Sequence, residues 1–152
     1  MAHNERVLEE YRRELDLAEY TQIRELYKAH SIAEDGRDLP GLIGTLTPDC
    51  VYEIPQTGHS WPGHEGAARF YGELLTAFPD IVFDLRNIVI GPQGVWEEAD
   101  VTGTWKAPWL GRPSTGERVE FGVQIFFPWD PAAGLFRGER IFQSQGSPVT
   151  QA

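Results

Sequence analysis

The sequence predicts an α+β fold in which helices pack on one face of a strongly curved sheet. Helical periodicity is found in the first half of the chain, most clearly at residues 64–80. After Pro79 the chain changes to β-branched and aromatic residues in segments of strand length, separated by turns rich in Pro and Gly. Helices first and strands afterwards are typical of this class rather than of alternating α/β proteins.

The segment at 64–80 is the best-defined predicted helix, and it backs the predicted sheet. Its apolar residues recur at steps of three and four, so one side is continuously apolar. Pro79 cannot continue a helix and biases Phe78 away from helical backbone angles, which ends the segment. The apolar face consists of Ala67, Phe70, Tyr71, Leu74, Leu75 and Phe78.

Two further helices precede this segment. Residues 4–18 and 21–34 each place apolar side chains on one helical face. The first forms an extra N-terminal helix within residues 1–20, suited to lie on a partner subunit. His30 is on the apolar face of the second helix and is expected to be a packed residue rather than a catalyst. Residues 34–38 then form a polar turn.

The predicted sheet begins with a strand at 50–54, which Pro55 closes. A loop rich in turn-forming residues follows at 56–63. After the helix at 64–80 the sequence predicts an antiparallel meander. Its four strands are expected at about 81–90, 94–105, 117–128 and 135–145.

Composition limits the classes of function. The 152 residues suffice for one domain, 1–152, and only 146–152 are expected to form a flexible tail. The formal net charge of −10 repels phosphate backbones and anionic lipids. We therefore expect neither nucleic acid nor a membrane as a partner.

Cysteine and histidine usage points away from a metal site and towards a reducing compartment. Cys50 is the single cysteine, so no internal disulfide can form, and the four histidines form no visible ligand cluster. The N-terminal segment is charged throughout and lacks the apolar centre of a signal peptide. We expect a cytoplasmic protein that binds no metal and no other cofactor.

Strand alternation predicts which side chains line the concave face, since residues two apart share a face. In the strand at 94–105 the more apolar set is turned inward, and it contains Glu97, Val101 and Trp105. In the last strand Glu139, Ile141 and Gln143 form one group and Arg140 and Phe142 the other. In the strand at 50–54 Val51 and Glu53 form one group and Tyr52 and Ile54 the other. Both faces of these two strands are mixed, so alternation alone leaves open which face turns inward.

Inward-facing acids are candidates for catalysis. If Glu53, Glu97 and Glu139 lie among aromatic residues, burial and like charge raise their pKa values, which suits a general acid or base near neutral pH. The alternative is that these acids lie at strand ends, solvated or paired with arginine.

Aromatic residues supply a possible wall for a ligand pocket. Trp105, Pro108 and Trp109 flank a loop from Lys106 to Gly116 that could close over a ligand. His59 and Trp61 lie in the loop before the helix. The alternative is that these aromatics are ordinary core or a dimer interface.

Several short motifs, in their order and spacing, resemble the SnoaL-like polyketide cyclase and ester cyclase family over roughly residues 21–145. The Phe-Pro-Asp turn and the Gly-x-Pro-x-Thr-Gly loop are the most specific of them. The motifs are Leu-Pro-Gly-Leu at 39–42, Asp49 to Pro55, Trp-Pro-Gly at 61–63, Ala-Phe-Pro-Asp at 77–80, Gly-Thr-Trp at 103–105, Gly111 to Gly116 and Gly-Glu-Arg-Ile at 138–141.

The resemblance implies a cone-shaped α+β fold shared with nuclear transport factor 2, scytalone dehydratase, ketosteroid isomerase and limonene epoxide hydrolase. It also implies a homodimer with a hydrophobic pocket, in which ring closure proceeds by acid-base chemistry without a cofactor. The chain departs from the family at its usual catalytic positions. Trp105 replaces a His, Ile141 replaces an Asp, and Val51 and Glu53 stand where related epoxide hydrolases carry Tyr and Asn.

The sequence therefore predicts a pocket for a small hydrophobic molecule, and the leading hypothesis is acid-base cyclisation, isomerisation or hydration of a polyketide-like or terpenoid-like substrate. The alternative is a noncatalytic binding or dimerisation module, and a buried carboxyl group within hydrogen-bond reach of a cavity would favour the enzyme. The candidate catalytic residues are Glu139 and Glu53, and the candidate substrate-binding residues are Trp105, Gln143, Trp61, His59, Trp109, Val101 and Ile141.

Overall fold

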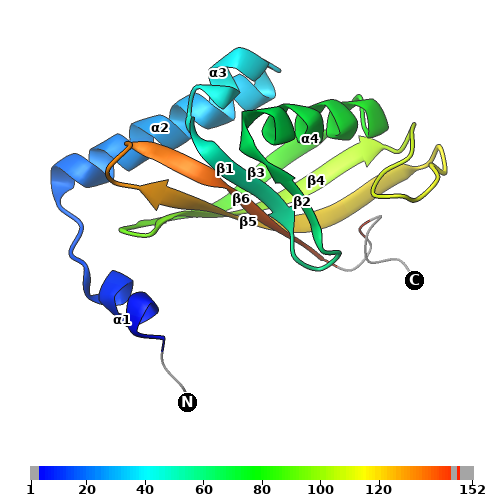
Figure 1. Cartoon of the computed structure of the whole chain (residues 1–152). Coiled ribbons are helices and arrows are strands. Elements are labelled where there is room, and N and C mark those ends of the chain that lie inside the picture. The colour runs from blue at the N-terminus through cyan, green and yellow to red at the C-terminus, as the bar shows by residue number, and fades with distance from the viewer. Residues whose placement is uncertain (1–3, 145–146, 148–152) are drawn as a thin grey trace.

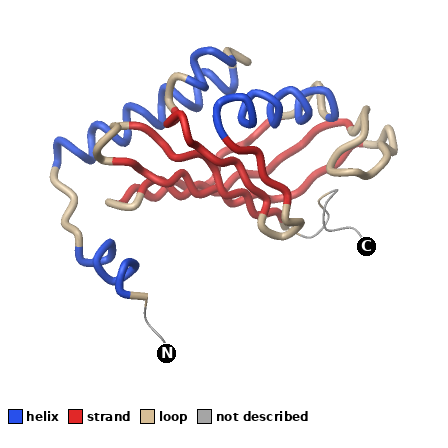
Figure 2. Tube along the Cα trace, in the orientation of Figure 1, coloured by secondary structure: helices blue, strands red, loops and turns tan. Residues whose placement is uncertain are grey.

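The computed structural model describes residues 4–144 and residue 147. Helices α2, α3 and α4 cover one face of a six-stranded curved sheet (Figures 1 and 2), so the predicted α+β class is confirmed. The elements are α1 (Glu5–Arg12), α2 (Leu17–Asp35), α3 (Leu39–Ile43), β1 (Leu46–Ile54), β2 (His59–Pro62), α4 (Gly63–Ala77), β3 (Val82–Gly91), β4 (Gly94–Thr104), β5 (Arg118–Asp130) and β6 (Leu135–Gln143).

The sheet has the strand order β2-β1-β6-β5-β4-β3. Strands β3 to β6 form the predicted antiparallel meander, while β1 lies parallel to β6 and antiparallel to β2. Strand β2, at His59–Pro62, falls in a segment for which a loop was expected. Its four residues are rich in turn formers, and pairing with β1 stabilises them as a strand.

The helix boundaries differ from the sequence prediction at two places. Helix α2 begins at Leu17 rather than near residue 21, because the Asp16 side chain accepts a hydrogen bond from the backbone N–H of Glu19 and caps the helix. It continues to Asp35, so Glu34 is helical and not part of a turn. Residues 4–18, expected to form one helix, instead form α1, a short non-helical connection and the first residues of α2.

Helix α1 lies apart from the helical layer, on the opposite side of the sheet (Figure 1). None of its residues is buried, and the chain after it is held by Arg13, which pairs with Glu19 at 2.7 Å and donates to the carbonyl of Pro92. The predicted tail at 146–152 lies outside the described residues, apart from Ser147. In the part of the chain that the structure describes, no helix is long and apolar enough to cross a membrane.

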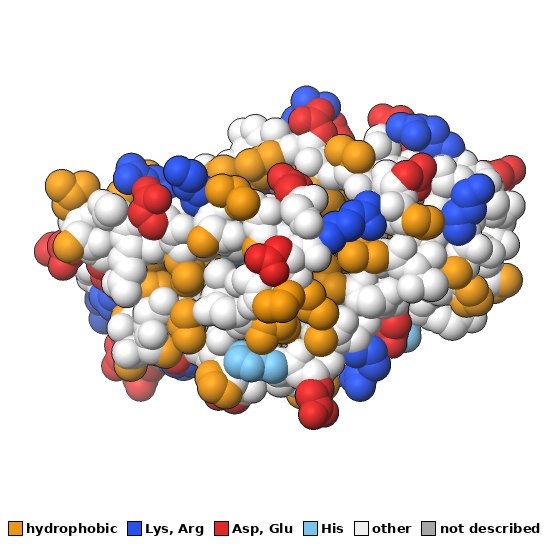
Figure 3. All heavy atoms as spheres, turned by 90° about the horizontal axis from the view of Figure 1, so that it is seen from above, with side chains coloured by type: hydrophobic (Ala, Val, Ile, Leu, Met, Phe, Trp, Pro, Cys, Tyr) orange, Lys and Arg blue, Asp and Glu red, His pale blue; other side chains and the backbone are white. Residues whose placement is uncertain are grey.

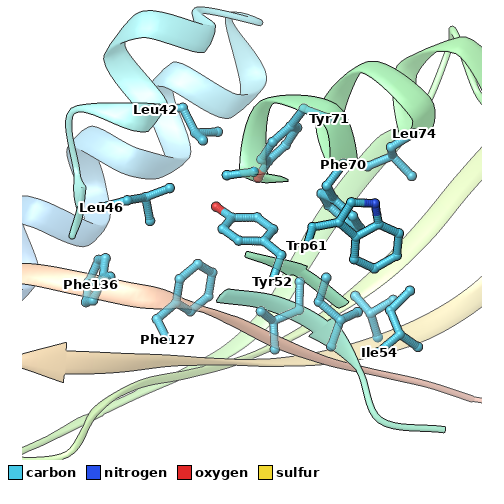
Figure 4. Packing of buried hydrophobic residues seen from close by; sticks show 14 of the residues in the cluster. Leu42, Leu46, Tyr52, Ile54, Trp61, Phe70, Tyr71, Leu74, Phe127 and Phe136 are labelled. Carbon is cyan, nitrogen blue, oxygen red and sulfur yellow. The ribbon is translucent and has the colours of Figure 1, made fainter. Parts of the chain in front are cut away.

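The core fills the space between the helical layer and the concave face of the sheet (Figure 4). In β4 the buried residues are those predicted to face inward, because alternation along a strand with one covered face is strict. In β1, Cys50, Tyr52 and Ile54 are fully buried. Thus β1 turns its aromatic and aliphatic side chains towards α4.

Candidate functional site

A carboxyl group lies at the centre of this core. Glu139 on β6 is only 2% exposed, so it faces inward, as the catalytic hypothesis required. One carboxyl oxygen, Oε1, is 3.0 Å from Nε2 of His30 and 3.3 Å from the hydroxyl oxygen of Tyr71. A buried carboxyl group needs such partners, because leaving it without them costs several kcal/mol, on the order of 2 to 7.

Three elements bring these partners together. His30 and Glu34 are four residues apart on α2, so both project from the same helical face towards the sheet. Tyr71 projects from α4, and its hydroxyl lies 3.0 Å from Oε1 of Glu34. Because the same hydroxyl is 3.3 Å from Glu139, Tyr71 bridges the two carboxyl groups.

A second tyrosine points into the same space. The hydroxyl ends of Tyr52 and Tyr71 are turned towards one another between β1 and α4 (Figure 4). Tyr52 is fully buried, and its hydroxyl lies near Glu139 and Tyr71 without a well-formed hydrogen bond to any described residue. This hydroxyl therefore remains available to a ligand oxygen or a water molecule.

Burial sets the proton affinities of the cluster. Burial raises the pKa of Glu139, and the hydroxyls of Tyr52 and Tyr71 oppose this rise because they favour the ionised carboxylate. Burial and the charge of Glu139 likewise raise the pKa of Glu34, whereas burial lowers the pKa of His30. Two carboxyl groups bridged by one hydroxyl cannot both ionise without strong repulsion, so near neutral pH one of them keeps a proton.

The two carboxyl groups line a small cavity of about 30 Å³, otherwise apolar, between α4 and the sheet. Next to it, at the end of α2, is a larger hollow of about 360 Å³. Glu34, Leu74, Ile81 and Phe83 line both, so Glu34 stands at the junction between the surface and the inner cavity. The inner cavity is lined by Glu34, Phe70, Leu74, Ile81, Phe83, Val101, Phe121, Ile125, Glu139 and Ile141.

The outer surface of the helical layer carries interspersed acidic and basic side chains, with hydrophobic ones between them (Figure 3). Among the described residues, no three His, Cys, Asp or Glu side chains gather in a way that could hold a metal ion. The cavity combines proton-transfer groups, Glu34 and Glu139, with apolar walls.

The sequence matches the SnoaL-like domain family over residues 23–136, which is more than half of the chain. The chain belongs to the SnoaL-like family. No curated protein sequence matches this SnoaL-like chain.

Solved structures share the fold of this SnoaL-like protein. A candidate SnoaL-like polyketide cyclase from Jannaschia sp. CCS1 aligns with a TM-score of 0.74 at 21% identity, covering 87% of this chain and 91% of that one. A SnoaL-like polyketide cyclase from Agrobacterium tumefaciens aligns with a TM-score of 0.66 at 16% identity, covering 81% and 91%. An LEH-like epoxide hydrolase from M. tuberculosis aligns with a TM-score of 0.63 at 18% identity, covering 83% and 85%.

Several predicted site residues of the SnoaL-like protein meet at the cavity. Glu139, Val101 and Ile141 line it. Gln143 shares their strand face and is buried, but its side chain accepts a hydrogen bond from Ser147 and lies outside the lining of this cavity. Glu97 also faces inward, where it accepts a hydrogen bond from the Tyr27 hydroxyl, and burial raises its pKa to about 7.

The expectation that Glu53 faces the pocket is wrong. Tyr52 and Ile54 occupy the inner face of β1, so Glu53 points to the outer face of the sheet. There it is partly exposed and pairs with Arg140 at 2.5 Å. This is the alternative that the sequence left open, an acid paired with arginine.

The predicted aromatic wall forms a cluster beside the cavity, and Phe70, which packs against Trp61 and Trp109, also lines the cavity. The rings of Trp61 and Trp109 stack with their centres 6.4 Å apart, and the ring of Trp105 stacks on that of Phe78 with their centres 6.1 Å apart. All three tryptophans are buried, and none lines the carboxyl cavity. His59 is exposed, with Nδ1 2.8 Å from the Thr57 hydroxyl.

Sequence reasoning missed Glu34 and Tyr71 as site residues, and it expected His30 to be a packed, hydrogen-bonded residue, as the structure shows. The spacing of His30 and Glu34 on one apolar helical face is a signal that could have found them, because two titratable groups on such a face need buried partners. The partner across the cavity, Tyr71, was predicted as a core residue of its helix, and its hydroxyl gives it the second role.

Proposed function

We propose that this protein is an enzyme that uses side-chain acid-base chemistry on a small, largely apolar carbonyl compound, such as a polyketide-like or terpenoid-like molecule. The observation that carries the proposal is the pair of carboxyl groups, Glu34 and Glu139, bridged by Tyr71 at an apolar cavity. Isomerisation and ring closure both begin with the same proton transfers, and the proposal covers these two reactions.

The pair supplies an acid and a base together. The ionised carboxylate takes a proton from the carbon next to the substrate carbonyl, and the electrons of that C–H bond form a C=C bond. The carbonyl oxygen takes a proton from the neutral carboxyl group as its π bond breaks. Tyr71, which touches both groups, can then pass a proton from one carboxyl group to the other and restore the starting state.

The apolar surroundings support this chemistry. Phe70, Leu74, Val101 and Ile125 line the cavity with apolar side chains beside the carboxyl groups, and an electrostatic interaction is stronger in such a medium. Ile141 stands where the related cyclases carry an acidic residue, and in this fold Glu139, on the same strand face, provides the carboxyl group.

A noncatalytic binding module is the second candidate, and one observation favours it. The inner cavity, about 30 Å³, has room for water rather than for a polyketide. An enzyme of this design has to widen the cavity towards the hollow beside Glu34, whereas a binding module can use the outer hollow alone.

The experiment is a thermal-shift screen of the purified protein with aromatic polyketide, steroid and terpenoid ligands, followed by turnover assays on the class that stabilises it. Loss of an acid-base group is expected to lower kcat by about 100-fold to 10,000-fold, so Glu139→Gln and Glu34→Gln should both lose activity.

Glu53→Gln is the matched control, because it makes the same change on the outer face of the sheet and should keep full activity. A ligand that binds the wild type and is turned over equally by wild type and Glu139→Gln would exclude the proposed chemistry. Binding without turnover by any variant would favour the binding module.

A further inference from the structure

A chain of short hydrogen bonds continues behind the carboxyl pair, away from the cavity. Nδ1 of His30 lies 2.6 Å from Oγ1 of Thr45, and the same Oγ1 lies 2.6 Å from the carbonyl oxygen of Leu42. All three residues are buried. This chain ends at a backbone carbonyl, which can only accept, so it has a fixed direction.

The direction follows from counting protons. A threonine hydroxyl has one hydrogen, and two oxygens 2.6 Å apart need a proton between them. Thr45 therefore donates to Leu42 and has only lone pairs left for His30. Consequently Nδ1 of His30 carries a hydrogen and donates it to Thr45.

With a hydrogen on Nδ1, the protonation state of Nε2 decides the protonation state of Glu139. Nε2 lies 3.0 Å from Oε1 of Glu139, and a hydrogen bond there needs one proton, placed on either atom. The proton on Glu139 gives a neutral pair, and the proton on His30 gives an ion pair.

We infer that Thr45 fixes the tautomer of His30, so that Glu139 is held as a neutral acid whose proton is shared with Nε2. The pair is enclosed, with exposed fractions of 0% for His30 and 2% for Glu139, and separating charge in such a site is unfavourable. The acids around His30 are Glu139 on β6, Glu97 on β4 and Glu34 on α2, and the rings of Phe127 and Phe136 pack against it.

This inference rests on the proposed function and assigns the two roles in it. Glu139 is the proton donor, and its hydrogen bond to Nε2 of His30 breaks as its O–H bond breaks and the substrate carbonyl oxygen takes the proton. Glu34, which is partly exposed and accepts the Tyr71 hydrogen bond, is the base. Thr45 and His30 are positioning residues, because they act on the substrate only through Glu139. The substrate class is an enolisable ketone or ester, with its carbonyl oxygen towards Glu139 and its acidic C–H bond towards Glu34.

The test is nitrogen NMR of the histidine rings in the full chain labelled with 15N-histidine, with the His30 signals assigned by their loss in His30→Gln. We expect Nδ1 of His30 to carry a hydrogen and Nε2 to be unprotonated and hydrogen-bonded. Neither signal should move between about pH 5.5 and pH 8.5, where a free imidazole titrates.

Thr45→Val removes the acceptor while keeping the shape of the side chain. We expect the His30 tautomer to change or become mixed, and Thr45→Ser to retain the wild-type spectrum. Thr47→Val is the matched control, because Thr47 is also a buried threonine and its hydroxyl has no partner among the described residues. It should leave the His30 signals unchanged.

A wild-type spectrum with both ring nitrogens protonated at neutral pH, or with the hydrogen on Nε2 alone, overturns the inference even if the variants do not fold. An unchanged tautomer in folded Thr45→Val also overturns it. The spectrum needs no substrate, so it tests the proton placement separately from the proposed function. If His30 shows the expected tautomer but no turnover is found, the proposed function is excluded and the inferred proton placement is still supported.

Discussion

Tyr52 and Tyr71 show how the effect of a single hydroxyl depends on its partners. Tyr71→Phe removes the bridge between Glu34 and Glu139, and we expect it to lower the free energy of unfolding by about 1 to 3 kcal/mol. Tyr52→Phe removes a buried hydroxyl that lies near Glu139 without a well-formed hydrogen bond, and we expect a change between zero and a gain of about 1 kcal/mol. Urea denaturation of both variants measures the difference. Equal losses would mean that Tyr52 has a partner in solution.

Glu97 predicts a pH dependence of stability. Its pKa is about 7 in the folded protein and near 4.5 in an unfolded chain, so the folded state binds the proton more tightly. The resulting stabilisation is complete below about pH 4.5 and is lost as the pH rises through 7. As the pH rises from 5 to 8, we expect the wild type to lose about 3 kcal/mol of its free energy of unfolding relative to Glu97→Gln, because the Gln side chain cannot titrate. Denaturation of both proteins at the two pH values measures this, and an unchanged difference would contradict it.

At the residue scale, strand alternation predicted the inward set of β4 and grouped Glu139 with Ile141 and Gln143 on β6. It could not decide which face of β6 or of β1 turns inward, and so the face of Glu139 or of Glu53, because both strands carry mixed residues on both faces. It could not find Tyr71 and Glu34 as partners of Glu139 either. Their meeting depends on how α2 and α4 cross the sheet, and a local pattern holds no information about that distance.

At the scale of elements, β1 and β6 approach closely where they pair in parallel, next to Glu139. Gly138 has φ of 112°, and a Cβ atom there would lie 2.0 Å from the carbonyl oxygen of Val51. We expect Gly138→Ala to lower the free energy of unfolding by more than about 3 kcal/mol, because backbone strain and the clash act together. Thermal or urea unfolding measures the loss.

Gly72→Ala is the control for that substitution. Gly72 lies in α4, and a Cβ atom there meets nothing within 4 Å. The better helix propensity of Ala should raise the free energy of unfolding by about 0.5 to 1 kcal/mol. A similar loss in both variants would show that the close pairing of β1 and β6 at Gly138 makes no particular contribution to stability.

The same elements show what the sequence could predict of the fold. Periodicity and turn residues were sufficient for α4 and for the four strands of the meander, because each signal is local. Strand β2 was missed, since pairing with β1 and not its own composition makes it a strand. The parallel pairing of β1 with β6 joins residues far apart in the chain, so no local pattern could predict it.

At the scale of the whole molecule, the outer face of the sheet bears on the expected homodimer. Trp96 is 41% exposed, and its ring lies 6.0 Å from that of Phe126 and 6.1 Å from that of Phe142. Exposed aromatic patches of this kind mark association sites. We expect the wild type to elute as a dimer in size-exclusion chromatography with light scattering, and Trp96→Lys to elute as a monomer.

Ile32→Lys is the control for the dimer. Ile32 is 61% exposed on α2 and receives the same change of charge, but it lies in the helical layer. It should leave the dimer intact. A wild-type monomer, or dissociation by Ile32→Lys alone, would exclude the outer sheet face as the interface.

Cys50 makes the inner layer accessible to chemical measurement. It is the only thiol of the chain, it is fully buried on β1, and burial raises the pKa of the thiol to about 11. A thiol reagent can therefore modify the native protein only when β1 separates from α4, so the labelling rate reports the frequency of that opening. A ligand seated between α4 and the sheet would slow the labelling, and the amount of slowing would give its affinity without a chromophore or a known reaction.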